Sequence, residues 1–195
     1  ARRGRIYLPV NELKQFDVKA QELLNRGYSE RFTALMAFQA ERAHRCYDEA
    51  LALLPDRAPI SLSYNIVNTD RNIGTRLSGR IAEIYGDHGL TKQTIHLTFH
   101  GTAGQSLGTF LVRGVSLTVI GEANDYVGKG MAAGEIIIRV PENAGFEAAT
   151  NTICGNTCLY GATGGALFAN GRAGERFAVR NSGATAVVAG VRDHG

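Results

Sequence analysis

One short stretch of this 195-residue chain matches the sequence pattern of a nucleophile elbow. The string "GQSLG", Gly104 to Gly108, fits the G-x-S-x-G pattern of hydrolases that transfer acyl groups, and His96 and His100 lie just before it. An elbow needs a helix after the serine, whereas the "TFLV" that follows is typical of a strand. The only histidine after the serine is His194, and it directly follows Asp193. The pattern therefore argues against a hydrolase.

A second glycine-rich stretch, "VGKGMAAGEIII", resembles a nucleotide loop in spelling only. Its glycines Gly128, Gly130 and Gly134 are spaced one residue too long for the dinucleotide fingerprint. The residues after it predict a strand, so no helix N-terminus would be present to hold a pyrophosphate. A phosphate-binding loop of the P-loop type also fails, because glycine and not a hydroxyl residue follows Lys129. We expect no nucleotide cofactor here.

Acidic and thiol side chains offer two candidate metal sites. Glu122, Asn124 and Asp125 cluster in "GEANDYVGKG", but they lack the regular acidic spacing of calcium loops. Turns whose Asn and Asp side chains bond the backbone explain this cluster better. Cys154 and Cys158 form a C-x3-C pair without two further ligands at suitable spacing, so small buried thiols are the favoured interpretation.

Composition places the chain among globular proteins. It is 44% hydrophobic and 20% charged, with 21 basic and 18 acidic residues interspersed, which gives a formal charge of +3. This balance argues against nucleic-acid binding. No segment reaches the roughly 18 apolar residues of a membrane helix, and the N-terminus lacks the apolar core of a secretory signal. We expect a soluble protein of the cytoplasm, and its three cysteines are too few for a disulfide framework.

The glycines divide the chain into two parts. Of 24 glycines, 22 lie from Gly74 onward. Upstream, residues 29–54 predict one long helix with Ser29 as N-cap and Pro55 as its stop, and its apolar stripe requires a partner surface. Residues 61–70 read as extended, residues 71–85 as a helix that contains Gly74 and Gly79 and has Gly86 as C-cap, and residues 94–100 as a half-buried strand.

The second part repeats itself. Gly114, Gly134, Gly165 and Gly183 each begin a short apolar strand, at intervals of 20, 31 and 18 residues. Such a period is typical of a β-solenoid, in which each coil stacks on the last. The predicted inward residues are Leu117, Val119, Ile136, Ile138, Leu167 and Val187. Glycine suits corners where φ is positive and coils lie close together. The predicted turn glycines are Gly104, Gly108, Gly114, Gly128, Gly130, Gly134, Gly155, Gly161, Gly165, Gly171 and Gly183.

Two long stretches of this second part carry a family resemblance. "GTAGQSLGTFLVRGVSLTVIGEANDYVGKGMAAGEIIIRV" and "GNTCLYGATGGALFANGRAGERFAVRNSGATAVVAGVRDHG" resemble the C-terminal GXGXG domain of the glutamate synthase large (alpha) subunit, from about residue 60 to the end. The resemblance implies a right-handed parallel β-helix with a structural, interdomain role and no catalytic residues. The family makes glutamate from glutamine and 2-oxoglutarate with FMN and an iron–sulfur cluster, which other domains hold. Those domains or subunits are the implied partners.

The first part resembles another family. Residues 1–57, beginning "ARRGRIYLPVNELKQ", are similar to a C-terminal fragment of squalene/phytoene synthase, in which Arg3, Arg5 and Tyr7 match residues near the prenyl pocket. Both aspartate-rich motifs that bind magnesium diphosphate in that family are missing, so we expect no prenyl transfer.

These two resemblances predict a domain boundary near residue 58. We expect a helical segment over 1–57 and a β-helix domain over 58–195 that lacks the later coils of its family. The hypothesis that we favour for the joining of these two segments is that the chain is a fragment or a chimera. The alternatives are a remnant prenyl synthase and a stand-alone β-helix interaction module.

Overall fold

The computed structural model describes residues 47–50, 59–91 and 94–195. All of these belong to one compact unit, Arg42–Gly195. Residues 47–50 are helical. The rest of the predicted helix over 29–54 lies outside the described residues, as do Cys46 and the squalene/phytoene-like residues Arg3, Arg5 and Tyr7. No helix in the described part of the chain is long and apolar enough to cross a membrane.

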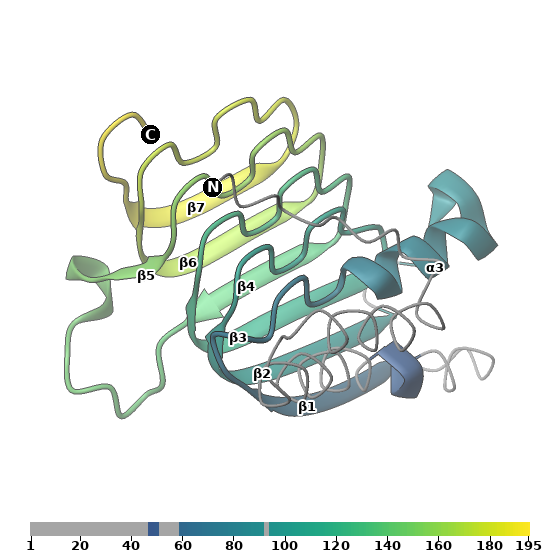
Figure 1. Cartoon of the computed structure of the whole chain (residues 1–195), viewed down its shortest axis with the longest axis horizontal. Coiled ribbons are helices and arrows are strands. Elements are labelled where there is room, and N and C mark those ends of the chain that lie inside the picture. The colour runs from purple at the N-terminus through teal and green to yellow at the C-terminus, as the bar shows by residue number, and fades with distance from the viewer. Residues whose placement is uncertain (1–46, 51–58, 92–93) are drawn as a thin grey trace, which may run out of the picture. The chain divides into compact units, whose positions relative to one another are not determined.

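A seven-stranded parallel sheet organises the described residues (Figure 1). Its strands follow the order β1-β2-β3-β4-β6, with β7 paired to the far side of β6 and the short β5 paired to β3 and β6. The strands are β1 (Ile60–Ile66), β2 (Ile95–Ala103), β3 (Val115–Ala123), β4 (Glu135–Arg139), β5 (Thr152–Cys154), β6 (Ala166–Ala173) and β7 (Thr185–Gly190). The strands predicted over 61–70 and 94–100 are therefore present as β1 and β2, although β1 ends at Ile66.

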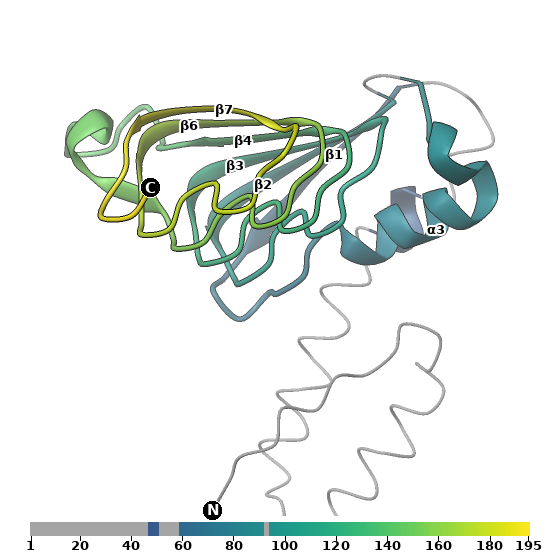
Figure 2. The same cartoon turned by 90° about the horizontal axis from the view of Figure 1, so that it is seen from above.

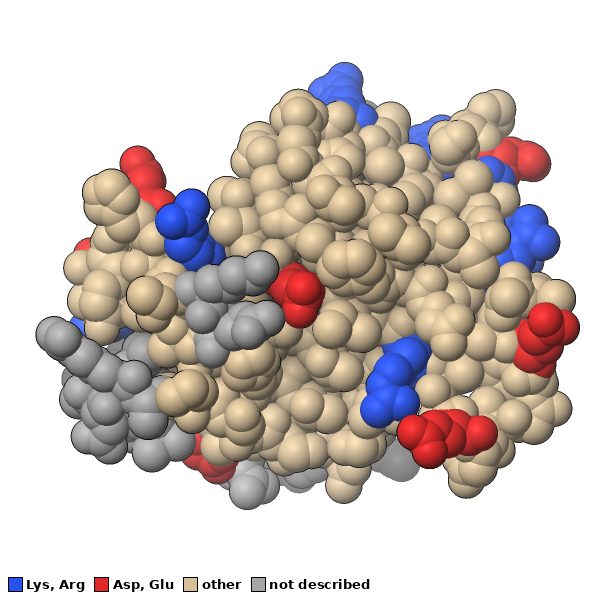
Figure 3. Space-filling model, turned by 180° about the vertical axis from the view of Figure 1, so that it is seen from behind, with Lys and Arg blue, Asp and Glu red and all other residues tan. Residues whose placement is uncertain are grey.

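The connections between strands form a second layer. Turn segments follow β2, β3, β5 and β6 and lie across the core from the sheet (Figure 2). Inward side chains of the strands meet apolar side chains of these turns, such as Leu107, Leu111 and Met131, each fully buried. The predicted inward residues Leu117, Val119, Ile136, Ile138 and Leu167 are all buried in this core. Figure 3 views the opposite, outward face of the sheet.

The register corrects one inward prediction. Leu117 pairs with Ile136 and Leu167 pairs with Ala186, so both steps are 19 residues and not the 20 and 18 of the glycine alignment. A slip of one residue moves a strand's side chains to the other face of the sheet. Val187 accordingly points outward and is 54% exposed, whereas Ala186 and Val188 pack against the core.

Helix α3 (Thr75–Tyr85) precedes β2 and buries Leu77, Ser78 and Ile81. The predicted cap at its C-terminus is confirmed, since the Gly86 N–H bonds to the Ala82 carbonyl. Gly74, which the sequence placed inside the helix, is instead its N-cap, with φ at 87°. The described residues also form two short 3-10 helices, η2 (Gly86–His88) after α3 and η3 (Ala148–Thr150) before β5.

Residues 47–50 pack beside β1 and α3. The Tyr64 hydroxyl of β1 donates to a carboxylate oxygen of Glu49 at 2.6 Å. The Arg76 guanidinium of α3 lies 4.0 Å from the centre of the Tyr47 ring, a cation–π contact. Ala50 is fully buried. For these four residues of the predicted helix, β1 and α3 thus supply the partner surface that its apolar stripe requires.

Candidate functional site

The glycine-rich turns share one backbone pattern. In the segment after β3, Tyr126, Gly128 and Gly130 have φ between 62° and 64°, so left-handed residues alternate with others. The same triplet of left-handed positions occurs in the other turn segments at 106/108/110, 157/159/161 and 176/178/180. Glycine takes this conformation without strain, whereas other residues resist it.

The N–H groups of this pattern bond to neighbouring turns. Gly128 donates to the Leu107 carbonyl at 2.8 Å in the preceding turn, and Gly130 donates to the Tyr160 carbonyl at 2.9 Å in the following one. Phosphate-binding loops need N–H groups that point at the ligand. Here these N–H groups already donate hydrogen bonds to neighbouring turns. The motif glycines therefore join successive turns and do not bind an anion.

Close packing adds to the backbone requirement at Gly130. A Cβ atom there would lie 2.7 Å from Cε1 of Phe110, in the turn before it. Its φ of 62° is also one that side-chain-bearing residues rarely adopt. Gly130 thus serves both the turn geometry and the spacing between neighbouring turns.

The structure separates the residues of the candidate nucleophile elbow. Ser106 has φ at 68° and sits in the turn layer, with no helix after it. His96 and His100 lie on β2 at positions that alternate with the buried Ile95, Leu97 and Phe99, so they point outward from the sheet. The apolar core lies between the serine and both histidines. These groups cannot act together as nucleophile and base.

The acidic and amide side chains of the second candidate site serve the turns. The Asn124 side chain accepts a bond from the Asp125 N–H at 2.7 Å and donates to Asn68 at 2.8 Å. The Asp125 carboxylate accepts from the Asn156 N–H at 2.7 Å. Glu122 accepts from the Thr102 hydroxyl in the neighbouring strand. These contacts agree with turns that use Asn and Asp to bond the backbone.

Cys154 and Cys158 are free thiols that contact each other in the core. Their Sγ atoms are 3.3 Å apart, and Cys158 also donates to the Gly155 carbonyl at 3.2 Å. The hydrogen bond with Cys158, together with burial, raises the pKa of Cys154 well above its usual value. A thiol that stays protonated is a poor nucleophile and a poor metal ligand. The favoured interpretation as buried thiols is confirmed for this pair.

The eleven predicted turn glycines fall into three groups. Positive φ angles occur at Gly108, Gly114, Gly128, Gly130, Gly134, Gly161 and Gly165. Gly104, Gly155 and Gly183 lie between strands without a positive φ, and a Cβ on each would overlap backbone atoms of a neighbouring segment. Gly171 differs from its prediction, because it lies inside β6 where the register with β7 shifts. There a Cβ would meet Ile153 at 2.7 Å.

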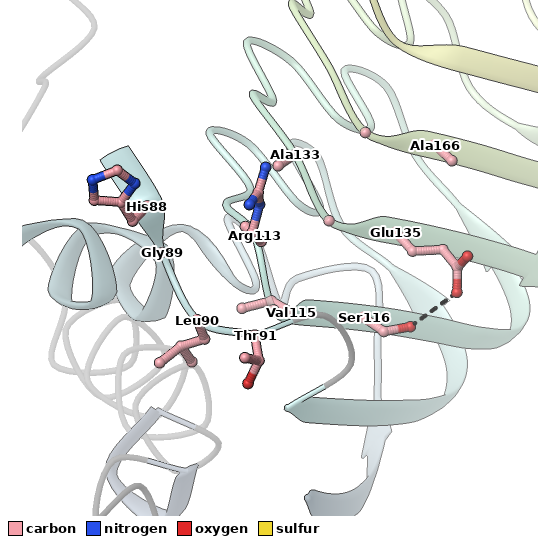
Figure 4. Close-up of a pocket in the computed structure, with 13 residues that line it drawn as sticks. His88, Gly89, Leu90, Thr91, Arg113, Val115, Ser116, Ala133, Glu135 and Ala166 are labelled. Atoms are coloured by element: carbon pink, nitrogen blue, oxygen red, sulfur yellow. Dashed lines mark hydrogen bonds between the residues drawn. The ribbon is translucent and has the colours of Figure 1, made fainter. Parts of the chain in front are cut away.

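One hollow of about 750 Å³ lies beside the first residues of β3, β4 and β6 (Figure 4). His88 and Arg113 stand on one side of it and Glu135 on the other, where Glu135 accepts a long bond of 3.4 Å from the Ser116 hydroxyl. Among the described residues, no hydrogen bond links His88 to this pair. The hollow thus has charge of both signs but no assembled acid–base system.

Sequence reasoning missed this hollow for a physical reason. It forms because η2 comes to lie beside strand starts that are far apart in the chain, which only the register specifies.

Among the described residues, no group of three His, Cys, Asp or Glu side chains is placed to hold a metal ion.

Comparison with known proteins identifies the family of this region. A family model described as "GXGXG motif" matches residues 43–195. The chain belongs to the GXGXG motif family. In the turn after β3, Gly128 and Gly130 show the alternating glycines for which the family is named. The match begins before the boundary predicted at residue 58 and includes the described residues 47–50.

Relatives that share the GXGXG region are glutamate synthases. The chain is 60% identical over 132 residues to ferredoxin-dependent glutamate synthase 2 of Synechocystis, covering 68% of this chain and 8% of that protein. It is 45% identical over 184 residues to the ferredoxin-dependent enzyme of Cyanidium caldarium, covering 92% and 12%. For the large chain of the NADPH enzyme of Azospirillum brasilense, identity is 52% over 151 residues, covering 77% and 10%. The chain thus spans about a tenth of these relatives' length.

A second family model, described as squalene/phytoene synthase, matches residues 1–82. It covers less than half of the chain and overlaps the GXGXG match over residues 43–82. Most of the residues that it matches lie outside the described part.

Proposed function

We propose that this chain is a non-catalytic, structural domain of a glutamate synthase large subunit, acting in the cytoplasm in ammonia assimilation and glutamate biosynthesis. The main supporting observation is the series of hydrogen bonds between turns, in which the N–H groups of Gly128 and Gly130 bond to carbonyls of neighbouring turns. These N–H groups are therefore not available as hydrogen-bond donors to a substrate. The identity to glutamate synthases over most of the chain supports the parent activity.

We further infer that the sheet and the turn layer are two sides of a right-handed parallel β-helix. Successive strands pair in parallel, and successive turns bond to one another in the same order. Each strand with its following turn would then be one coil. Right-handed crossovers are the general rule for parallel strands.

The described residues do not fit the cofactors that the resemblance implies. An iron–sulfur cluster needs about four cysteine thiolates, whereas the described residues contain only Cys154 and Cys158, buried against each other. The phosphate of FMN would need free N–H donors, which the stacked turns have already used. We therefore assign FMN and the cluster to other domains of the synthase, which are also the proposed partners.

One assay tests the structural role. The isolated chain is incubated with glutamine, 2-oxoglutarate and reduced ferredoxin, and glutamate is measured against the Synechocystis relative as a positive control. We expect no glutamate above background, because we assign the catalytic groups and cofactors to other domains of the synthase. Glutamate formation by the isolated chain would overturn the proposal.

The second candidate function is a remnant of squalene/phytoene synthase, which the family match over residues 1–82 favours. It predicts release of diphosphate from farnesyl or geranylgeranyl diphosphate in the presence of magnesium. We expect no release, because the sequence lacks both aspartate-rich motifs. Diphosphate release that disappears on adding a chelator would reverse the ranking.

A further inference from the structure

The outward face of the sheet carries an uncharged row of side chains. The register aligns Ser63, Thr98, Thr118, Ile137, Phe168 and Val187 across β1, β2, β3, β4, β6 and β7. The rows on either side of it contain the residues two positions before and two positions after its members on each strand. In these rows the charged residues are Glu135 and Arg139, both on β4. Figure 3 shows this face with wide areas free of Lys, Arg, Asp and Glu.

The β4, β6 and β7 half of the row is apolar, with Ile137 half-buried and Phe168 and Val187 exposed. Phe168 is 37% exposed and Val187 is 54% exposed, and the register places them beside each other and beside Ile137. A shallow hollow of about 440 Å³ runs along these three residues. Large contiguous apolar patches on a protein surface mark interaction sites, whereas single exposed apolar residues are ordinary.

The other half of the row differs in chemistry. Ser63, Thr98 and Thr118 present hydroxyl groups that form hydrogen bonds without carrying charge. Interface centres are depleted of charged residues in the same way. The row thus offers an apolar half and a hydroxyl half, which a matching surface would have to complement.

The described residues leave the apolar half of the outward row uncovered. The inward face meets the turn layer, but none of the described residues covers the outward row. The chain spans 8–12% of the three relatives considered above, so about nine-tenths of each relative lies outside the matched region. That remainder is the source of cover that the observations favour.

We propose that the outward row docks against an uncharged surface of a neighbouring domain of the glutamate synthase polypeptide. Apolar side chains of that domain would pack on Ile137, Phe168 and Val187, and its hydrogen-bonding groups would face the Ser63, Thr98 and Thr118 half. This inference rests on the proposed function, since it names the surface through which a structural domain contacts its neighbour.

Carbene footprinting tests the docked face, because a photolysed diazirine labels all types of accessible side chain. The isolated chain and the intact Synechocystis relative are labelled in parallel, and aligned peptides are compared. We expect the peptides that carry Ile137, Phe168 and Val187 to be labelled several-fold less in the intact enzyme. Equal labelling in the two proteins would overturn the proposal.

A variant separates the domain partner from a second copy of the chain. Val187→Asp is compared with Val179→Asp, a change in the turn after β6 at a valine that is 37% exposed. By light scattering we expect the unchanged chain and both variants to be monomers. A dimer that only Val187→Asp dissociates would assign the row to a second copy and overturn the domain proposal. Glutamate formation by the isolated chain would overturn the structural role, whereas the footprint reports only on the docked face.

Discussion

Gly121 of β3 pairs with Gly101 of β2 so closely that a Cβ on Gly121 would overlap the carbonyl oxygen of Gly101. Both residues have positive φ, at 148° and 120°. A Cβ on Gly101 would in turn overlap the carbonyl of Ile66, its partner in β1. The three outermost strands on this side are therefore held at a spacing that only glycine permits at these positions.

Gly121→Ala tests this contact. We expect the free energy of unfolding to fall by about 2–4 kcal/mol, because the methyl group meets a backbone atom that cannot move without separating two strands. Urea denaturation measures the change. Gly145→Ala is the matched control, since no heavy atom lies within 4 Å of a Cβ there, and it should change stability by less than about 0.5 kcal/mol. Equal stability of the two variants would show that β2 and β3 can separate freely.

Gly79→Ala should stabilise the chain. Gly79 lies in the exposed interior of α3 with nothing within 4 Å of a Cβ, and alanine favours a helix over glycine by about 1 kcal/mol. We expect the urea midpoint to rise accordingly. Gly74→Ala, in the N-cap of the same helix, should instead destabilise, because its φ is 87° and a Cβ would lie 3.0 Å from Leu117. A lower stability of the Gly79→Ala variant would contradict the free space that the structure shows around a Cβ at this position.

The sequence predicts the elements of this fold better than their register. Alternation at Ile95, Leu97 and Phe99 marks β2 clearly, and Gly86 marks the end of α3. In β7, by contrast, Ala186, Val187 and Val188 are consecutive apolar residues, so no alternation distinguishes the two faces. An alignment anchored on glycines then slips by one residue, which places Val187 on the wrong side.

The candidate site shows the same limit. The roles of Asn124 and Asp125 follow from turn chemistry that acts over a few residues, and these could be predicted. The outward row and the Gly101–Gly121 contact join neighbouring positions that lie 19 to 35 residues apart in the chain, and only the strand register brings them together. A glycine inside the strand pattern "TFHGTA" reads as a turn until its paired strand is known.

Arg176→Gly should stabilise the turn after β6. Arg176 is exposed and has φ at 54°, a left-handed conformation that costs non-glycine residues about 1–2 kcal/mol. Glycine recovers part of that energy and loses some to the entropy of the unfolded chain, so the expected gain is up to about 1 kcal/mol. Thermal unfolding measures it. Arg192→Gly, an exposed change without a positive φ, should give no gain, and an equal rise in both variants would point to charge and not to backbone strain.

The thiol pair predicts how stability changes with pH. Hydrogen bonding to Cys158 and burial raise the pKa of Cys154, so the folded chain keeps this proton at a pH where the unfolded chain, with a thiol pKa of about 8.5, loses it. The stabilisation is complete below about pH 8. Above that pH the unfolded state binds fewer protons, so stability should fall by up to about 1.4 kcal/mol per pH unit until the folded thiol ionises.

Cys154→Ala isolates this contribution from other groups that titrate at high pH. Alanine fits the position, because the register partners of Cys154 are Ala123 and Ala173. Urea unfolding between pH 7 and pH 10 should show a steeper loss of stability for the unchanged chain than for the variant. The difference should open only above about pH 8, where the unfolded thiol begins to ionise. Parallel curves across the whole range would mean that the folded environment of Cys154 does not hold its proton.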